Sequence, residues 1–369
     1  MMKRCIFHIP YELEAEAKAA PMLRPAKMIE AFESIGYAVD VVSGYAKERA
    51  KRIKAIEKNI LNGVKYDFMY AESSTMPTLL TEKHHLPLHP FLDFNFFAFV
   101  KEHGIKIGLF YRDIYWKFDD YKKLVIWWKA YAAIANYKYD LQQYKKYLNK
   151  IYLPSLRVHK YLPEIPSYMV DILPPGALLI NEEKECCFNS RDYSKRPLQI
   201  FYVGGLGNQY QIKELLVAVC KVKNCRVTIC CRKDEYEKEK NNLAEALSEN
   251  IEIVHASGKN LEPYYKKADI CSLLFKPDIY REMAIPYKTF EYLSHLKPMI
   301  ASQGTAIGDF VSDNNIGWTI NYSADEIERL LNKIIDGTEN LEEKYKSCVP
   351  ARDKNTWQCR ALKVAGDLM

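Results

Sequence analysis

The sequence lacks the patterns that identify common metal and redox sites. Its ten cysteines include no CxxC pair, so zinc-binding and thioredoxin-type chemistry have no support. Most of these thiols are expected to be small buried hydrophobes in a reducing cytoplasm. No DxD motif occurs either, and we therefore predict no metal site and no metal-bridged substrate.

Long hydrophobic runs are also absent. The longest uncharged apolar stretches, such as LVIWW at 124–128, are much shorter than the roughly 18 residues of a membrane-spanning helix. The apolar run behind the first basic residues is too short for a signal peptide and is followed at once by acidic residues. We therefore expect a cytoplasmic protein that is not integral to a membrane.

Positive charge is present but unevenly distributed. Residues 1–180 hold 26 Lys and Arg against 19 Asp and Glu, a net charge of +7, whereas residues 181–369 carry −1. The excess is concentrated at 121–150, for which the pattern predicts one long amphipathic helix with tryptophans and a basic side. Its lysines recur at a spacing of seven: Lys122 and Lys129, then Lys138 and Lys145.

This basic segment has two interpretations. One is a solvated helix face, and the other is a surface that docks on an anionic membrane. A nucleic-acid partner is not expected, because the segment has no recognisable nucleic-acid motif and the sequence pI of about 8.6 is modest.

Apolar, β-branched and aromatic runs alternate with segments of helical period through the whole chain, which predicts an α/β fold with parallel strands and crossover helices. In the first half the predicted strands are 4–10, 38–44, 66–72, 105–112, 150–155 and 169–176. The same alternation restarts at residue 198, with predicted strands at 198–205, 225–231, 251–257, 268–275, 297–302 and 317–320. Two doubly wound, Rossmann-like domains in tandem are expected, with a boundary in the polar stretch 177–197.

The stretch FYVGGLGNQYQIKELLVAV at 201–219 reads as a strand, a glycine-rich turn and a helix. Gly204, Gly205 and Gly207 would let the backbone approach a ligand, and the helix that follows would offer unpaired N–H groups to an anion. The pattern is neither GxxxxGK[ST] nor GxGxxG. It therefore indicates either a phosphate site or only a tight connection.

The stretch IPYKTFEYLSHLKPMIAS at 285–302 places a lysine and a glutamate at the start of a helix. Pro286 suits the first turn, so Lys288 lies at a helix N-terminus, where the helix dipole also favours an anion. Glu291 lies about one turn on and can accept two hydrogen bonds from a vicinal diol such as a ribose. The pair therefore suits a nucleotide diphosphate with its sugar, and the alternative is an ordinary surface ion pair.

Taken together, these stretches resemble the donor-binding domain of GT-B glycosyltransferases, particularly the retaining family 4 kind. The resemblance covers residues 198–360 and implies that Glu291, in the FEYL-type motif, holds the ribose of the donor nucleotide. It also implies an earlier acidic residue on the transferred sugar. The candidate is Glu282, although eight residues separate it from Glu291 where the family has seven.

The same family carries an arginine and a lysine on the diphosphate after the glycine turn. Here Leu206 and Asn208 occupy the region of that arginine, Lys213 is the nearest lysine, and Arg232 or Arg281 would replace the arginine. His255 follows a strand at the place where backbone groups in such folds meet the base.

In the first half, YRDIYW at 111–116 follows a strand and is expected to face the acceptor. Arg112 and Tyr115 are acceptor-side candidates, and Asp113 is a candidate base, the alternative being a structural Arg112–Asp113 ion pair. His8 closes the first strand and is either a catalytic base or a satisfied strand end.

The resemblance implies an acceptor-binding domain at 1–180, a donor-binding domain at 181–350, and a C-terminal helix at 351–369 that packs back on the first domain. The implied activity is transfer of a sugar from a nucleotide-diphosphate sugar to an acceptor hydroxyl, with retention, in cell-surface polysaccharide or glycan synthesis. No cofactor is expected beyond the donor, for which UDP, GDP and dTDP stay open. The expected acceptor is a saccharide or a lipid-linked saccharide, reached from the inner face of the cell membrane. The alternatives are a non-catalytic relative that partners another transferase and a nucleotide-sugar epimerase.

Overall fold

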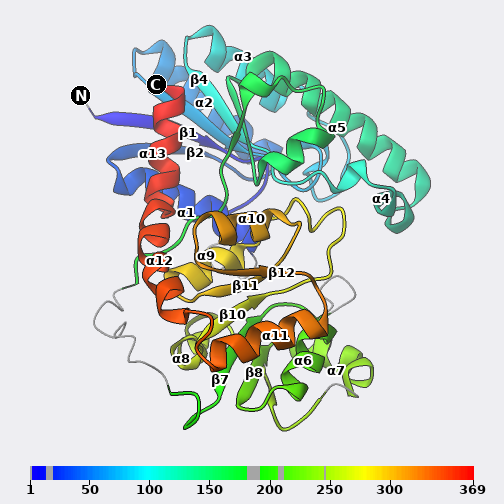
Figure 1. The fold of residues 1–369 in the computed structure, drawn as a ribbon. Coiled ribbons are helices and arrows are strands. Elements are labelled where there is room, and N and C mark those ends of the chain that lie inside the picture. The colour runs from blue at the N-terminus through cyan, green and yellow to red at the C-terminus, as the bar shows by residue number, and fades with distance from the viewer. Residues whose placement is uncertain (1, 14–19, 181–191, 207–211, 245–246) are drawn as a thin grey trace. The chain divides into compact units, whose positions relative to one another are not determined.

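The computed structural model describes residues 2–13, 20–180, 192–206, 212–244 and 247–369. The chain divides into two compact units (Figure 1). Unit 1 comprises Met1–Gly176 and Trp357–Met369, and unit 2 comprises Ala177–Thr356. Each unit contains one parallel six-stranded sheet with helices on its faces, which confirms the α/β doubly wound fold.

Unit 1 contains the sheet β2-β1-β3-β4-β5-β6. Its strands are β1 (Lys3–His8), β2 (Tyr37–Val42), β3 (Phe68–Glu72), β4 (Lys106–Phe110), β5 (Lys150–Leu153) and β6 (Val170–Ile172). Its helices are α1 (Ala20–Ser34), α2 (Ala46–Leu61), α3 (Leu92–Glu102), α4 (Asp119–Leu124), α5 (Trp127–Tyr147) and α13 (Trp357–Leu368). The C-terminal helix α13 packs on α1 and on β3 and β4, with Trp357, Ala361 and Val364 buried.

The expected single helix at 121–150 is wrong. The chain leaves the helical conformation at Val125 (φ −115°, ψ 139°) and Ile126 (φ −51°, ψ 130°), so α4 and α5 are separate helices. β-Branched side chains lose rotamer freedom in a helix and favour extended backbone, which accounts for a break at this pair. Lys122 therefore lies on α4 while Lys129 lies on α5, and the two do not share one helix face.

Unit 2 contains the sheet β12-β11-β10-β7-β8-β9. Its strands are β7 (Leu198–Val203), β8 (Cys225–Cys230), β9 (Ile251–Val254), β10 (Ile270–Leu273), β11 (Met299–Ser302) and β12 (Gly317–Ile320). Its helices are α6 (Lys213–Lys221), α7 (Lys233–Leu243), α8 (Glu262–Lys267), α9 (Tyr287–Ser294), α10 (Ala306–Asp313), α11 (Ala324–Ile335) and α12 (Leu341–Lys354). Side-chain caps define three of the starts, because Thr305, Ser323 and Asn340 accept the backbone N–H three residues on.

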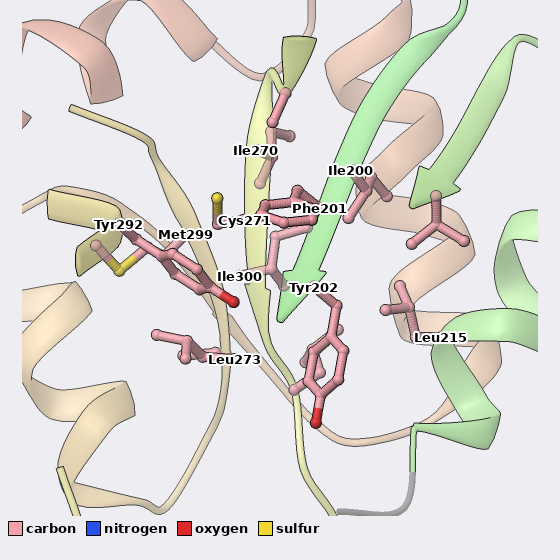
Figure 2. Packing of buried hydrophobic residues seen from close by; sticks show 14 of the residues in the cluster. Ile200, Phe201, Tyr202, Leu215, Ile270, Cys271, Leu273, Tyr292, Met299 and Ile300 are labelled. Atoms are coloured by element: carbon pink, nitrogen blue, oxygen red, sulfur yellow. The ribbon is translucent and has the colours of Figure 1, made fainter. Parts of the chain in front are cut away.

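The core of unit 2 is built around β7, in which every residue is buried. Such uninterrupted burial is expected of a parallel strand covered on both faces. Figure 2 shows Leu215 of α6 on the same side of the strand as Ile200, and Tyr292 of α9 on the other side. Phe201 lies against Tyr265 of α8, whose ring in turn contacts Tyr292. This packing fixes α6, α8 and α9 relative to the carboxyl end of β7.

Candidate active site

The strand order of unit 2 defines where a ligand would bind. From β7 the chain proceeds outward through β8 to β9, then returns to the other side of β7 to form β10, β11 and β12. The connections therefore diverge at the carboxyl ends of β7 and β10, and open α/β sheets bind ligands at such a switch point. The glycine turn follows β7 directly, so the first candidate stretch lies at this place.

The turn after β7 is held by one hydrogen bond from Tyr202 of the same strand and by one to the neighbouring strand β8. The Tyr202 hydroxyl donates to the Gly205 carbonyl at 2.7 Å, and the Gly204 N–H donates to the Cys230 carbonyl at the end of β8 at 3.0 Å. A Cβ at Gly204 would lie only 2.6 Å from the Tyr202 hydroxyl, so a side chain here would displace either the turn or the buried Tyr202 ring. Gly207 lies outside the described residues.

Helix α9 starts where the sequence predicts, with Pro286 as the N-cap rather than as the first helical residue. Phe290 and Leu293 are fully buried, and the Tyr292 hydroxyl accepts the backbone N–H of Val203 at 3.1 Å. Residues four apart lie on one side of a helix, so Lys288 shares the side of Tyr292 that meets the end of β7. The predicted lysine is thus brought beside the glycine turn.

Lys288 and Glu291 form an ion pair, with 2.6 Å between Nζ and Oε2, and both side chains are about one-third exposed. Burial raises the pKa of the Cys230 thiol at the end of β8, and the ammonium of Lys288 is close enough to oppose that rise. The carboxyl ends of β7 and β8 and the start of α9 therefore meet in one place, with a lysine and a glutamate at its surface.

Arg232 is the N-cap residue of α7 and follows β8 at the same edge of the sheet. Its guanidinium is exposed. It pairs with Glu235 at 3.3 Å, and the other oxygen of Glu235 accepts the backbone N–H of Leu206 at 3.2 Å. Glu235 is not among the site residues predicted from the sequence. Its place three residues after Arg232, in the first turn of a predicted helix, is the signal that could have found it.

The remaining predicted residues of unit 2 lie around this edge. His255, just after β9, donates from Nδ1 to the Cys231 carbonyl at 2.9 Å. Lys213 is the exposed first residue of α6. Arg281 lies over the Phe275 ring at 4.7 Å, and the carbonyl of Glu282 accepts the N–H of Ala306, the first residue of α10, at 2.8 Å. The segment before α9 is thereby attached to the ends of β10 and β11.

Unit 1 contains a buried ion network at the ends of β3 and β4. Arg112 donates to Glu72 at 2.8 Å and to the Tyr11 hydroxyl at 2.8 Å, and Arg24 lies 3.2 Å from the other oxygen of Glu72. The carboxylate that lies 2.8 Å from the Arg112 guanidinium is therefore that of Glu72, and not that of Asp113 as the alternative prediction had it. Glu72 is 1% exposed and was missed, because within its strand it reads as one polar residue at a strand end.

Asp113 and Tyr115 follow Arg112 in the turn after β4. The Asp113 carboxylate accepts the backbone N–H of Tyr115 at 2.8 Å, and both residues are half-buried. Burial raises the pKa of Asp113, and the hydrogen bond from Tyr115 only partly opposes this. A carboxylate with a raised pKa is suited to proton transfer.

His8 ends β1 but is only 2% exposed. Its Nε2 lies 2.8 Å from Asp93, which also receives two hydrogen bonds from Arg49 at 2.9 and 3.0 Å. Burial by itself would raise the pKa of Asp93, but the hydrogen bond from His8 and the charge of Arg49 together lower it. The Nε2 contact with Asp93 favours a structural role at the strand end, while the buried Nδ1 has no hydrogen-bond partner among the described residues.

Comparisons with known proteins agree with this geometry. Residues 197–339 match the family model for glycosyl transferases group 1, a range that holds the glycine turn, α7 and α9. No curated protein matches the sequence. Among solved structures, HepE of Anabaena in complex with UDP is similar with a TM-score of 0.67 at 10% identity, over 100% of this chain and 99% of that one.

Two further structures show the same two-unit architecture. Sucrose-phosphate synthase of Thermosynechococcus elongatus has a TM-score of 0.61 at 14% identity, over 99% of this chain and 98% of that one. WaaG, a glycosyltransferase involved in lipopolysaccharide biosynthesis, has a TM-score of 0.57 at 12% identity, over 99% of both chains. The chain therefore has the GT-B fold. Within this fold, residues 197–339 are the part that is similar to the group 1 glycosyl transferases.

Proposed function

We propose that the protein is a glycosyltransferase that binds a nucleotide-diphosphate sugar on unit 2 and transfers the sugar to an acceptor hydroxyl. The observation that carries the proposal is the fixed position of α9. The Tyr292–Val203 hydrogen bond attaches α9 to the strand that leads into the glycine turn, and Lys288 pairs with Glu291 on that helix. Lys288 there suits a diphosphate, and Glu291 suits the two ribose hydroxyls.

In the proposed reaction the bond between the sugar C1 and the diphosphate breaks, and the acceptor oxygen forms the new bond to C1. The departing diphosphate gains negative charge, which Lys288, the backbone N–H groups after β7 and the start of α6 would stabilise, together with one or more of Lys213, Arg232 and Arg281. Glu282 would contact the transferred sugar, and the loop before α9 holds it near the carboxyl ends of β10 and β11.

We propose retention of configuration, in which the acceptor proton passes to an oxygen of the leaving diphosphate. No protein base is then required. Inversion would need one, and Asp113 suits that role better than His8, because its pKa is raised while its side chain stays half-exposed. Arg112 and Tyr115 would then contact the acceptor or the transferred sugar.

A thermal-shift panel of UDP, GDP, dTDP and ADP, alone and as sugar conjugates, tests the proposal. HepE is described in complexes with UDP and with UDP-glucose, so these are the first ligands to try. One nucleotide at 100 times its dissociation constant should add about 2.7 kcal/mol of stability to the wild type. Glu291→Ala should abolish the shift.

The matched control is Glu342→Ala, which removes an ion pair of the same kind with Lys346, 2.7 Å long, on α12. It should keep the wild-type shift. A wild-type protein that unfolds cooperatively but shows no shift with any nucleotide would contradict the proposed donor site.

For the acceptor we propose a saccharide or lipid-linked saccharide in the synthesis of a cell-surface glycan. The likeness to a lipopolysaccharide glycosyltransferase supports this class. No helix in the described ranges is long and apolar enough to span a bilayer. We propose peripheral attachment to the inner face of the cell membrane, where a lipid-linked acceptor would be reached. The candidate surface is the α4–α5 corner.

Large hydrophobic side chains are exposed at that corner. Trp127 is 71% exposed, and Leu124, Ile126, Trp128 and Tyr131 are also exposed. Lysines accompany them: Lys122 and Lys123 on α4, and Lys129, Lys138 and Lys145 on α5 are all exposed. Tryptophan and tyrosine at a lipid interface, with lysines facing anionic headgroups, is the combination that binds a membrane surface.

Binding to liposomes that contain anionic lipid tests this surface. Neutralising Lys122, Lys129, Lys138 and Lys145 to glutamine should abolish sedimentation with the liposomes. The control neutralises four exposed lysines of α2, Lys47, Lys51, Lys54 and Lys58, which removes the same charge elsewhere. Unchanged binding of the first variant would reject the membrane surface.

A further inference from the structure

Glu235 places a negative charge at the proposed phosphate turn. Its Oε2 accepts the backbone N–H of Leu206 at 3.2 Å, and Leu206 follows the two glycines after β7. Its Oε1 lies 3.3 Å from a guanidinium nitrogen of Arg232. One carboxylate therefore contacts both a backbone N–H group and a guanidinium that could otherwise bind a diphosphate at this edge.

This contact is not the ordinary one for a glutamate at its position. Glu235 is the third residue of α7, and a glutamate there commonly reaches back to the backbone N–H of the N-cap residue. Here its Oε2 instead crosses to the turn after β7, 29 residues earlier in the sequence. The side chain is about one-quarter exposed, so it can move into solvent without opening the core.

We infer that Glu235 is a placeholder anion, which the diphosphate of the donor displaces from the Leu206 N–H and from Arg232. The inference rests on the proposed donor site and adds a positioning residue to it. Before the donor binds, the carboxylate keeps the turn and Arg232 in the arrangement that receives an anion. When the donor binds, the diphosphate takes over both contacts, and Arg232 is available to the leaving group.

The sign of the effect on binding separates this role from a purely structural one. A placeholder competes with the ligand, so its removal tightens nucleotide binding. If Glu235 only held the turn together, its removal would disorder the site and weaken nucleotide binding. Glu235→Gln is the suitable change, because the amide oxygen can still accept the Leu206 N–H while the charge is gone.

The test measures the dissociation constant of UDP, or of whichever nucleotide the panel selects, by titration calorimetry on the full-length protein. Glu235→Gln should bind about three- to tenfold more tightly than the wild type in 20 mM salt, and the gain should shrink in 500 mM salt. The matched control is Glu237→Gln on the same helix, whose carboxylate pairs with Lys240 at 2.5 Å. It should leave the dissociation constant unchanged.

A double-mutant cycle identifies the partner. Because Glu235 pairs with Arg232 and competes with the nucleotide for it, Arg232→Ala should weaken nucleotide binding more in the Glu235→Gln background than in the wild type. The inference is overturned if Arg232→Ala has the same effect in both backgrounds. It is also overturned if neither Glu235→Gln nor Glu235→Ala binds the nucleotide more tightly than the wild type. In both cases nucleotide binding by the wild type would still support the donor site. Absence of nucleotide binding to the wild type would instead remove the donor site and the inference with it.

Discussion

The hydrogen bond between Tyr292 and Val203 should control both the stability of unit 2 and its affinity for the donor. Tyr292→Phe removes only the hydroxyl oxygen that accepts the Val203 N–H at 3.1 Å. Both residues are buried, so the N–H of Val203 loses its partner where water does not replace it. An unsatisfied buried donor costs about 1–3 kcal/mol.

For a unit of this size that cost lowers Tm by about 2–4 °C for each kcal/mol. We therefore expect Tyr292→Phe to unfold about 2–12 °C below the wild type. The dissociation constant of the donor nucleotide should rise as well, because α9 loses its hydrogen bond to the strand that leads into the glycine turn.

The control is Tyr345→Phe in the same unit. The Tyr345 hydroxyl donates to the carbonyl of Asp269 at 3.1 Å, just before β10 and so at the opposite edge of the sheet. This variant should lose some stability and keep the wild-type affinity. The reasoning is refuted if Tyr292→Phe matches the wild type in Tm, or if both variants change nucleotide affinity equally.

Three other substitutions test the site and the packing of unit 1. Gly204→Ala puts a Cβ 2.6 Å from the Tyr202 hydroxyl, so the turn or the buried Tyr202 ring that bonds to it must shift, and nucleotide affinity should fall about tenfold in calorimetry, or 1.4 kcal/mol. Burial raises the pKa of Asp140 to about 7, from 3.8 when unfolded, so the free energy of unfolding should fall as pH rises from about 4 to about 7. Asp140→Asn should remove that fall in urea unfolding measured from pH 4 to pH 8. Glu72→Gln leaves the buried guanidinium of Arg24 without its full counter-charge and should cost about 3–5 kcal/mol in urea unfolding.

Each of these has a matched control. Gly366→Ala adds a Cβ with nothing within 4 Å and should leave nucleotide affinity unchanged. Asp120→Asn and Glu33→Gln remove exposed carboxylates and should change stability by less than about 0.5 kcal/mol. Wild-type affinity of Gly204→Ala, a wild-type pH profile for Asp140→Asn, or full stability of Glu72→Gln would each contradict its prediction.

Much of the fold could be predicted from local pattern. Each strand in the described ranges overlaps a segment that the alternation of apolar and helical stretches predicts, because a buried parallel strand needs a short, nearly continuous apolar run. The start of α9 was also predictable, since proline restricts the backbone before a helix. The break between α4 and α5 was not predicted. The spacing of charged and aromatic residues suggested one continuous helix at 121–150, whereas Val125 and Ile126 are not helical and interrupt it.

The sequence by itself determined the α/β architecture, the glycine turn and the placement of Lys288 and Glu291 in one helical turn, since these depend on neighbours a few residues apart. Only the tertiary structure decided which distant groups meet them. Tyr292 and Val203 are 89 residues apart, Glu72 and Arg112 are 40 apart, and Glu235 and Leu206 are 29 apart. These contacts exist because the strand order brings the carboxyl ends of β10, β7 and β8, and of β3 and β4, side by side, and no local sequence pattern encodes that order.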